Sequence, residues 1–283
     1  MSCAVDIRLL HDSESDLARA DRLLTTAYRP PSWRLEVETY LRTEPNGWFV
    51  AEEGGEIVAM AGGLAYGRFC WLGLVATLPG WERRGYASQL SARVTEWAKD
   101  RGCRTVALDA SEKGRPVYER LGFRPVGETV VLIAPSTPTP ADARIGDRID
   151  DLDELLAFDR SVFGGDRATL LHSIQELESP GVYAVRDGDG LAGYLFARGG
   201  SLGPGCARSP AVAEQLLRAA LPDASSRVDG DVRLLLPVES AYPDVLSSLG
   251  FEKSRSLTHM RLGDQQLPGE RQLLIAQASL AAG

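Results

Sequence analysis

The chain has 283 residues, of which 44% are hydrophobic and 25% charged, and its formal net charge is −8. This length is comfortable for two domains, and the hydrophobic share is too high for a disordered chain. The acidic balance argues against a general nucleic-acid binder, which needs a basic face, and favours cationic substrates such as amines.

No apolar run approaches the length of a membrane span, and the N-terminus lacks the basic and then apolar pattern of an export signal. The cysteines and histidines are scattered, without the spacing of a metal site; they are Cys3, Cys70, Cys103, Cys206, His11, His172 and His259. We therefore expect reduced thiols, no metal, no membrane association and a cytoplasmic location.

The N-terminal part of the chain alternates between strand and helix patterns. Two adjacent prolines at Pro30-Pro31 separate its two helical stretches, because proline stops a helix. The predicted elements are a strand at Val5 to Leu9, a helix at Glu14 to Tyr28, a helix at Trp33 to Thr43 capped by Ser32, and a hairpin of Trp48 to Glu52 and Glu56 to Ala65.

An apolar strand at Phe69 to Val75 leads into a loop that opens directly into a helix. The helical pattern begins after Gly85 and ends at Gly102. The start of a helix offers unpaired N–H groups and partial positive charge, and Arg83 and Arg84 add two cations there. Since Gly85 lets an anion approach the backbone, the loop predicts a phosphate or pyrophosphate site. Taken alone, the pattern is equally typical of a turn with solvated arginines.

A second motif follows at Gly114-Arg115-Pro116-Val117-Tyr118-Glu119-Arg120-Leu121-Gly122-Phe123. The predicted elements around it are a strand at Thr105 to Ala110, a short helix at Arg115 to Leu121 and a strand at Val126 to Ile133. Together, the loop and this motif resemble the acetyl-CoA site of the GNAT-type N-acetyltransferase superfamily. The resemblance implies an α/β (α+β) fold, in which a mixed, mostly antiparallel twisted sheet is flanked by helices. It also implies a splay between the strands ending near Val75 and Ala110, which takes the cofactor arm.

The proline-rich stretch Ala134 to Ala141 predicts a linker. After this linker, the second half of the chain faintly repeats the pattern of the first half. The matching features are a strand–turn–strand at Val182 to Gly193, a helix at Pro210 to Leu221, a strand at Val232 to Pro237 and Leu249-Gly250-Phe251. We expect two tandem GNAT-like domains: residues 1–134 as the catalytic domain, residues 135–142 as the linker, and residues 143–283 as a degenerate copy.

The second copy departs from the first where the chemistry would lie. Cys206 to Ala213 stands in place of the Arg83-Arg84-Gly85 loop, and Pro210 there removes one N–H donor. Leu246 stands in place of Tyr118. We expect that the second domain does not bind acetyl-CoA productively, and that it completes the substrate pocket or stabilises the fold.

The resemblance also implies roles for residues of the first domain. Tyr118 would be the general acid that protonates the leaving thiolate. Backbone N–H groups around Leu74 to Ala76 would polarise the thioester carbonyl. The full cofactor-binding set that it implies is Leu74, Val75, Ala76, Thr77, Glu82, Arg83, Arg84, Gly85, Tyr86, Ala87, Ser88, Ser111, Gly114 and Arg115.

Two residues depart from the family pattern. Glu82 stands where the family has Arg or Gln, and because a carboxylate repels a pyrophosphate we expect Glu82 to contribute only its backbone. Ser111 replaces a frequent Asn and has a shorter reach. Both changes would weaken the binding of the cofactor without abolishing activity.

The general base stays open, because the strand Phe69 to Val75 carries no acidic residue. The candidates are Asp109, Glu36, Glu38 or an ordered water. Residues predicted to contact the substrate are Tyr28, Trp33, Asp109, Asp166 and Arg167. For the last two, an ion pair that caps the next helix is an equally good interpretation.

These features predict an acetyl-CoA-dependent N-acetyltransferase that acts on a small amine or an amino-bearing antibiotic by direct attack in a ternary complex. We expect a monomer or a homodimer. Two alternatives are a protein N-terminal or lysine acetyltransferase, and a non-catalytic module that binds or sequesters acyl-CoA. The presence of Tyr118 disfavours the second alternative, since a pure binder has no need of a proton donor.

Overall fold

The computed structural model of the chain describes residues 6–29, 31–135, 147–188, 190–228 and 230–283. These residues form two units. Unit 1 takes the described residues up to Pro125, together with Met260–Gln265 and Ala282. Unit 2 takes Val126–His259, Gln266–Ala281 and Gly283.

The sheet of unit 1 runs in the order β1-β2-β3-β4-β5. Its strands are β1 (Asp6–Leu9), β2 (Trp48–Glu53), β3 (Glu56–Ala65), β4 (Phe69–Thr77) and β5 (Thr105–Ala110). The strands β1 to β4 pair antiparallel with one another, whereas β5 pairs parallel to β4. A parallel neighbour requires a crossover, and the helix between β4 and β5 supplies it.

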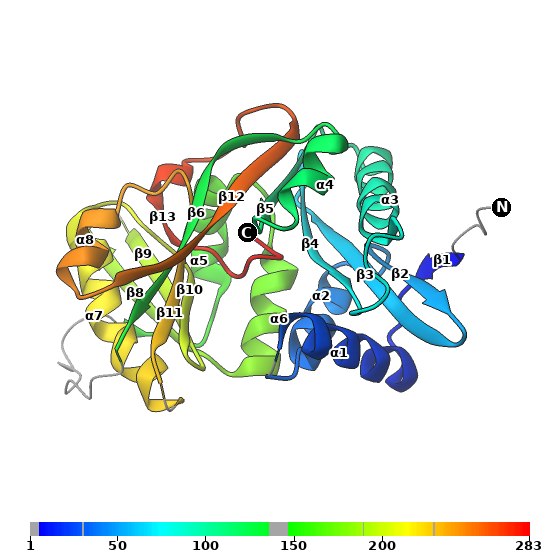
Figure 1. Cartoon of the computed structure of the whole chain (residues 1–283). Helices are drawn as coiled ribbons and strands as arrows, with labels where there is room; N and C mark the ends of the chain where they lie inside the picture. Colours follow the sequence, from blue (N-terminus) through cyan, green and yellow to red (C-terminus); the bar gives the residue numbers. More distant parts are fainter. Residues whose placement is uncertain (1–5, 30, 136–146, 189, 229) are drawn as a thin grey trace. The chain divides into compact units, whose positions relative to one another are not determined.

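Four helices belong to unit 1: α1 (Glu14–Tyr28), α2 (Arg34–Thr43), α3 (Tyr86–Asp100) and α4 (Arg115–Arg120). The apolar face of α3, with Leu90 and Val94, packs into a core with Val58 and Leu72 of the sheet. Figure 1 shows α1 and α2 on the other side of this sheet. The sheet is therefore covered by helices on both faces, as its nearly continuous apolar strands require.

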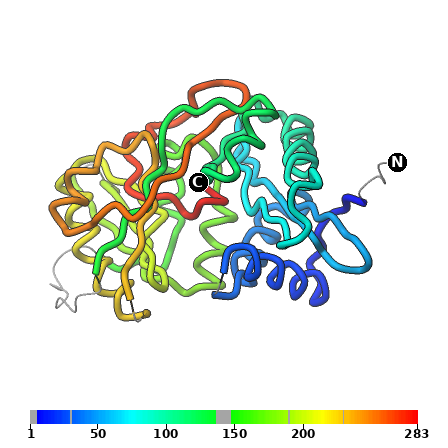
Figure 2. Tube along the Cα trace, viewed as in Figure 1, coloured from blue at the N-terminus to red at the C-terminus, as the bar shows by residue number. Residues whose placement is uncertain are grey.

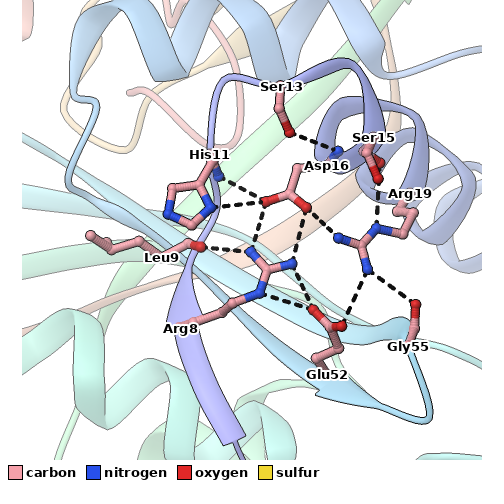
Figure 3. A network of polar contacts seen from close by, with 9 residues as sticks. All are labelled: Arg8, Leu9, His11, Ser13, Ser15, Asp16, Arg19, Glu52 and Gly55. Carbon is pink, nitrogen blue, oxygen red and sulfur yellow. Dashed lines mark hydrogen bonds and ion pairs between the residues drawn. The ribbon is translucent and has the colours of Figure 1, made fainter.

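The start of α1 is fixed to the sheet by charged side chains. Ser13 caps the helix by accepting the N–H of Asp16. The Arg8 guanidinium lies between the carboxylates of Asp16 and Glu52, at 2.7 Å and 2.6 Å, and so joins α1 to β1 and β2 (Figure 3).

Unit 2 repeats the plan, with strand order β6-β11-β10-β9-β8-β7 and β13 paired to β10. Its strands are β6 (Arg124–Ala134), β7 (Asp147–Arg148), β8 (Gly181–Asp187), β9 (Gly190–Arg198), β10 (Ser201–Ala207), β11 (Val232–Leu236), β12 (Glu252–Gly263) and β13 (Leu274–Ala276). Two of these strands cross between the units: β6 begins in unit 1, and β12 ends there, where Met260 joins the core.

The helices of unit 2 are α5 (Asp153–Phe163), α6 (Ala168–Glu178), α7 (Pro210–Ser226) and α8 (Pro243–Ser248), with a 3₁₀ turn η1 at Arg271–Leu273. The apolar face of α7, with Leu216 and Leu217, packs into a core with Leu195 and Leu234 of the sheet. Within the part of the chain that the structure describes, no helix has the length and apolar character needed to cross a membrane.

The predicted fold class is confirmed, and most element boundaries lie within a few residues of their predicted places. The N-cap of α2 is Trp33 and not Ser32, one residue later than predicted, although the Ser32 hydroxyl accepts the Arg34 N–H of α2 at 3.3 Å. The helix α7 continues past Leu221 through Pro222 to Ser226. Most of the predicted linker lies outside the described residues, so the linker and the domain limits stay predictions.

Candidate active site

The strands β4 and β5 of unit 1 separate after a short paired stretch. They are paired from Phe69 with Thr105 to Trp71 with Ala107. Both strands continue beyond this ladder, β4 to Thr77 and β5 to Ala110. Beyond the ladder, the residues of β4 and β5 no longer pair with each other, and we call this region between the two strands the fork. The resemblance implies a splay of this kind.

A bulge in β4 lies within the fork. Pairing with β3 shifts between Gly62–Gly73 and Met60–Ala76, so two residues of β4 stand opposite one residue of β3. Leu74 in this bulge has φ of 49°, in the left-handed region that non-glycine residues rarely adopt. Bulges withdraw backbone groups from the ladder and re-aim them, and strained backbone of this kind is concentrated at functional sites.

The bulge is held from α1 by a tyrosine. The Tyr28 hydroxyl donates to the carbonyl oxygen of Val75 at 2.7 Å, and the Tyr28 ring packs against Trp33 with centroids 5.4 Å apart. Burial of the hydroxyl raises the pKa of Tyr28, although the residue as a whole is 41% exposed. An electrostatic contribution from Tyr118 raises that pKa further. Tyr118 belongs to the apolar core of unit 1, against which Val75 of the bulge packs.

Tyr118 itself is buried in α4 and packs edge-on against Phe123, with ring centroids 5.9 Å apart. Burial raises its pKa above the ordinary tyrosine value, so the phenol keeps its proton at neutral pH. A protonated hydroxyl near a strand bulge can donate a hydrogen bond or a proton to a group held in the fork.

The helix α3 begins directly after the fork. Gly85 is its N-cap with φ of 89°, and no side chain caps this end in the part of the chain described. The first backbone bond of the helix runs from Gln89 N–H to the Gly85 carbonyl. The N–H groups of Tyr86, Ala87 and Ser88 precede that bond, and such groups form an anion site at a helix start.

Two charged residues of the loop before α3 are held by neighbours. The Arg84 guanidinium lies over the Trp81 ring at 4.5 Å from its centroid. The Glu82 carboxylate pairs with Lys113 at 2.8 Å, and this ammonium lowers the pKa of Glu82. No local pattern of the sequence predicts the role of Lys113, because its partner lies 31 positions away. Arg83 has φ of 62°, so the loop carries a second strained residue.

The segment before α4 is an internally bonded turn. The Ser111 hydroxyl accepts the Gly114 N–H at 3.1 Å, and the Ser111 carbonyl accepts the Arg115 N–H at 2.9 Å. The Arg115 guanidinium pairs with Glu119 one turn further along α4, at 2.7 Å. These bonds fix the start of α4 and with it the position of Tyr118.

Two of the residues predicted to contact the substrate belong to unit 2. Asp166 accepts the N–H of Ala168 at 3.0 Å at the start of α6 and pairs with Arg160. The Arg167 side chain is fully buried and binds both carboxylate oxygens of Asp159, at 2.8 Å and 2.9 Å. Both residues therefore serve ion pairs within unit 2.

Among the candidate bases, Asp109 is half-buried on β5, and Glu38 pairs with Arg34 at 2.7 Å. Glu36 lies in the first turn of α2. Within the described ranges, no group of three or more His, Cys, Asp or Glu residues could hold a metal ion.

Two family models match the chain. One, described as acetyltransferase (GNAT) family, covers residues 14–123, and the other, acetyltransferase (GNAT) domain, covers residues 155–276. A holothin acyltransferase of Pseudoalteromonas is 26% identical over 260 residues, covering 88% of this chain and 85% of the relative. An uncharacterized N-acetyltransferase of Bacillus subtilis is 27% identical over 209 residues, covering 70% of this chain and 72% of the relative.

Solved structures share the fold over the whole chain. A putative acetyltransferase from Pyrococcus horikoshii has a TM-score of 0.85 at 21% identity, covering 99% of this chain and 96% of its own. A tandem GNAT protein from the clavulanic acid biosynthesis pathway has a TM-score of 0.64 at 16% identity, covering 92% of this chain and 98% of its own. The fork, the helix start and the two matched domains agree: the chain belongs to the GNAT acetyltransferase family and is a tandem acyltransferase of that family.

Proposed function

We propose that unit 1 binds acetyl-CoA and transfers its acetyl group to the amine of a small molecule by direct attack in a ternary complex. The observation that carries this proposal is the grouping around β4. The Tyr28 hydroxyl binds the bulge at Val75, and Val75 packs against the core cluster that contains Tyr118. A tyrosine that can donate a proton thus belongs to the same cluster as the strained bulge of the fork.

Each part of the grouping has a role in the transfer. The N–H groups at the start of α3 hold the pyrophosphate, and the fork takes the pantetheine arm. An N–H group at the bulge of Leu74 stabilises the negative charge that develops on the thioester oxygen. As the amine nitrogen bonds to the carbonyl carbon and the C–S bond breaks, the electron pair goes to sulfur and Tyr118 supplies its proton.

The acceptor is an amine in its neutral form, since only the neutral nitrogen has an electron pair to donate. The net charge of −8 attracts amines to the protein surface in their protonated, cationic form, before the nitrogen loses its proton and reacts. The tandem architecture is shared with a protein of the clavulanic acid pathway, which supports a metabolite as the acceptor.

The test is a calorimetric titration of acetyl-CoA into the wild type and into two matched variants, Gly85→Arg and Gly102→Arg. Both glycines have positive φ, 89° and 83°, at opposite ends of α3. Either substitution costs about 1–2 kcal/mol of backbone strain. Only Gly85→Arg places a side chain at the predicted pyrophosphate loop.

We expect Gly85→Arg to weaken acetyl-CoA binding at least about tenfold, or 1.4 kcal/mol, and Gly102→Arg to leave it unchanged. A thermal melt of both variants confirms that they are folded. If the wild type does not bind acetyl-CoA, or if both variants lose binding equally, the proposed site is wrong.

A further inference from the structure

Unit 2 contains its own fork at the position that corresponds to the fork of unit 1. The parallel strands β10 and β11 are paired at Ser201 with Arg233 and at Leu202 with Leu234. Beyond these pairs β10 continues to Ala207 and β11 to Leu236. In both units the crossover helix follows the first strand of the fork, α3 after β4 and α7 after β10.

This second fork is filled by the chain itself. The strand β13 runs antiparallel to β10, with Ala276 beside Gly205 and Leu274 beside Cys206. Figure 2 traces this C-terminal part of the chain in red. On the other arm of the fork, the N–H of Gln277 donates to the Leu235 carbonyl at 2.9 Å. The segment Leu274–Gln277 therefore binds the backbone of both strands at once.

The fit of this segment is close. Ile275 and Ala276 have no exposed surface and belong to the core of unit 2. A Cβ atom on Gly203 would lie 2.4 Å from the Gln277 carbonyl oxygen, so only glycine lets the two backbones approach this closely. The fork is shaped around a peptide rather than left open.

The helix that follows the fork is also closed to an anion. Ser209 caps α7 by accepting the N–H of Val212 at 3.4 Å, and Pro210 contributes no N–H at the first helical position. The Tyr242 hydroxyl donates to the carbonyl of Ala207 at the end of β10. In unit 1 the corresponding helix start is an uncapped glycine.

We propose that Leu274–Gln277 is a built-in occupant of the unit 2 fork, taking the backbone positions that a pantetheine arm takes in unit 1. The inference rests on the proposed function for the role of the unit 1 fork. Its consequence is that each chain binds a single acyl-CoA, in unit 1, and that acyl-CoA does not displace the segment. An extended peptide can take the place of a ligand between two strands, because either one can form hydrogen bonds with their unpaired backbone groups.

Hydrogen exchange of the full chain, followed by mass spectrometry with and without acetyl-CoA, tests the proposal. We expect residues 274–277 to exchange slowly in the free protein and at the same rate with acetyl-CoA. Residues 201–207 and 232–236 should likewise be unchanged, whereas residues 74–88 should become protected. Faster exchange of residues 274–277 on addition of acetyl-CoA, or new protection of residues 201–212, would overturn the proposal.

The failure of the proposed function has a different signature. In that case acetyl-CoA protects no part of residues 74–88, while slow exchange of residues 274–277 still supports an occupied fork. Rapid exchange of residues 274–277 in the free protein would overturn the occupant itself, whatever acetyl-CoA does in unit 1.

A matched pair of variants gives a second test of the occupied fork. Ile275→Asp places a charge inside the fork, whereas Gln272→Asp places the same charge on an exposed neighbour. We expect Ile275→Asp to speed the exchange of residues 274–277 at least about tenfold and Gln272→Asp to leave it unchanged. Equal effects of the two substitutions would contradict the proposal.

Discussion

The Tyr28 hydroxyl donates a hydrogen bond of 2.7 Å to the Val75 carbonyl oxygen, and so ties the end of α1 to the bulge of β4. A carbonyl in a bulge has no partner in the ladder, and a side chain that binds it fixes the local backbone. The neighbouring Leu74 has φ of 49°, a conformation that persists only when its surroundings hold it. We infer that Tyr28 positions the bulge for the reaction.

Replacing Tyr28 by Phe removes this bond and keeps the ring. We expect kcat to fall by about tenfold, since a net hydrogen bond is worth about 0.5–1.5 kcal/mol and 1.4 kcal/mol is a factor of ten. The Kd of acetyl-CoA should not change, because the loop before α3 is untouched. Steady-state kinetics and titration of acetyl-CoA measure the two quantities separately.

The matched control is Tyr183→Phe, which removes a tyrosine hydroxyl that bonds to Asp223 at 3.2 Å in unit 2. It should leave kcat at the wild-type value. A purely structural role for Tyr28 would show as a lower melting temperature with an unchanged kcat, and this result would refute the positioning role.

The local elements of unit 1 can be predicted from the sequence. The bounds of α1 and β5 follow from apolar periodicity, and the start of α3 at Gly85 follows from a residue that tolerates positive φ. The resemblance predicts Tyr28 as a substrate contact. Its bond to Val75, 47 positions away, could not be read from the sequence, because no local pattern encodes a contact across the fold.

The second half of the chain was harder to predict for the same reason. The strand β13 is three residues long and exists because β10 offers it an open edge. The Trp33 N–H at the start of α2 is bound by Asp21 of another helix, 12 positions away. Short strands and hydrogen bonds supplied by distant residues depend on tertiary contacts, which propensity alone does not report.

Replacing Tyr118 by Phe tests its role as proton donor. We expect kcat to fall by roughly a hundredfold, in the range typical of general acids, while acetyl-CoA still binds. Burial raises the pKa of Tyr118, so in the wild type the phenol should stay protonated as the pH rises through about 10, the ordinary tyrosine value. The kcat of the wild type should therefore not fall through ionisation of Tyr118 up to that pH.

A pH profile of kcat for the wild type and Tyr118→Phe checks both statements. An alkaline fall in the wild type with a midpoint below about 10, absent from the variant, would show that Tyr118 ionises more easily than its burial implies. Unchanged kcat in the variant would remove Tyr118 from the mechanism.

Asp16 makes the stability of unit 1 sensitive to acid (Figure 3). Burial alone would raise the pKa of this carboxyl, but bonds from Arg8, the His11 N–H and Arg19 outweigh it and hold the pKa well below its usual value. The unfolded chain then binds more protons in acid than the folded chain. The contribution of Asp16 is therefore complete above about pH 4 and is lost as the pH falls below it.

We expect Asp16→Asn to lower the free energy of unfolding by about 1.5–3 kcal/mol at neutral pH, the range for hydrogen bonds to charged groups. The difference from the wild type should shrink as the pH falls below about 4. Urea unfolding across this pH range measures it. Glu214→Gln, which breaks an exposed pair with Arg218, is the control and should show no such pH dependence. A constant difference would contradict the role of the Asp16 charge.

Two ion pairs near the start of α6 differ in burial and so should differ in energy. Arg167 and Asp159 have side chains 0% and 2% exposed, whereas Arg160 and Asp166 are 61% and 57% exposed. Arg167→Met leaves a buried carboxylate without its cation, which costs about 3–5 kcal/mol. Arg160→Met breaks a solvated pair, which is worth about 0–1 kcal/mol.

Denaturant unfolding of the two variants measures this contrast, and the double variant Asp159→Leu with Arg167→Met should recover part of the lost stability because no buried charge then remains. The same proteins decide the predicted substrate role of Arg167. If Arg167 contacted the acceptor, the KM for the acceptor would rise in Arg167→Met while the unfolding midpoint stayed at the wild-type value. We expect the reverse, because its guanidinium is bound on one side by Asp159 and packs on the other against the Phe163 ring, 4.0 Å from the centroid.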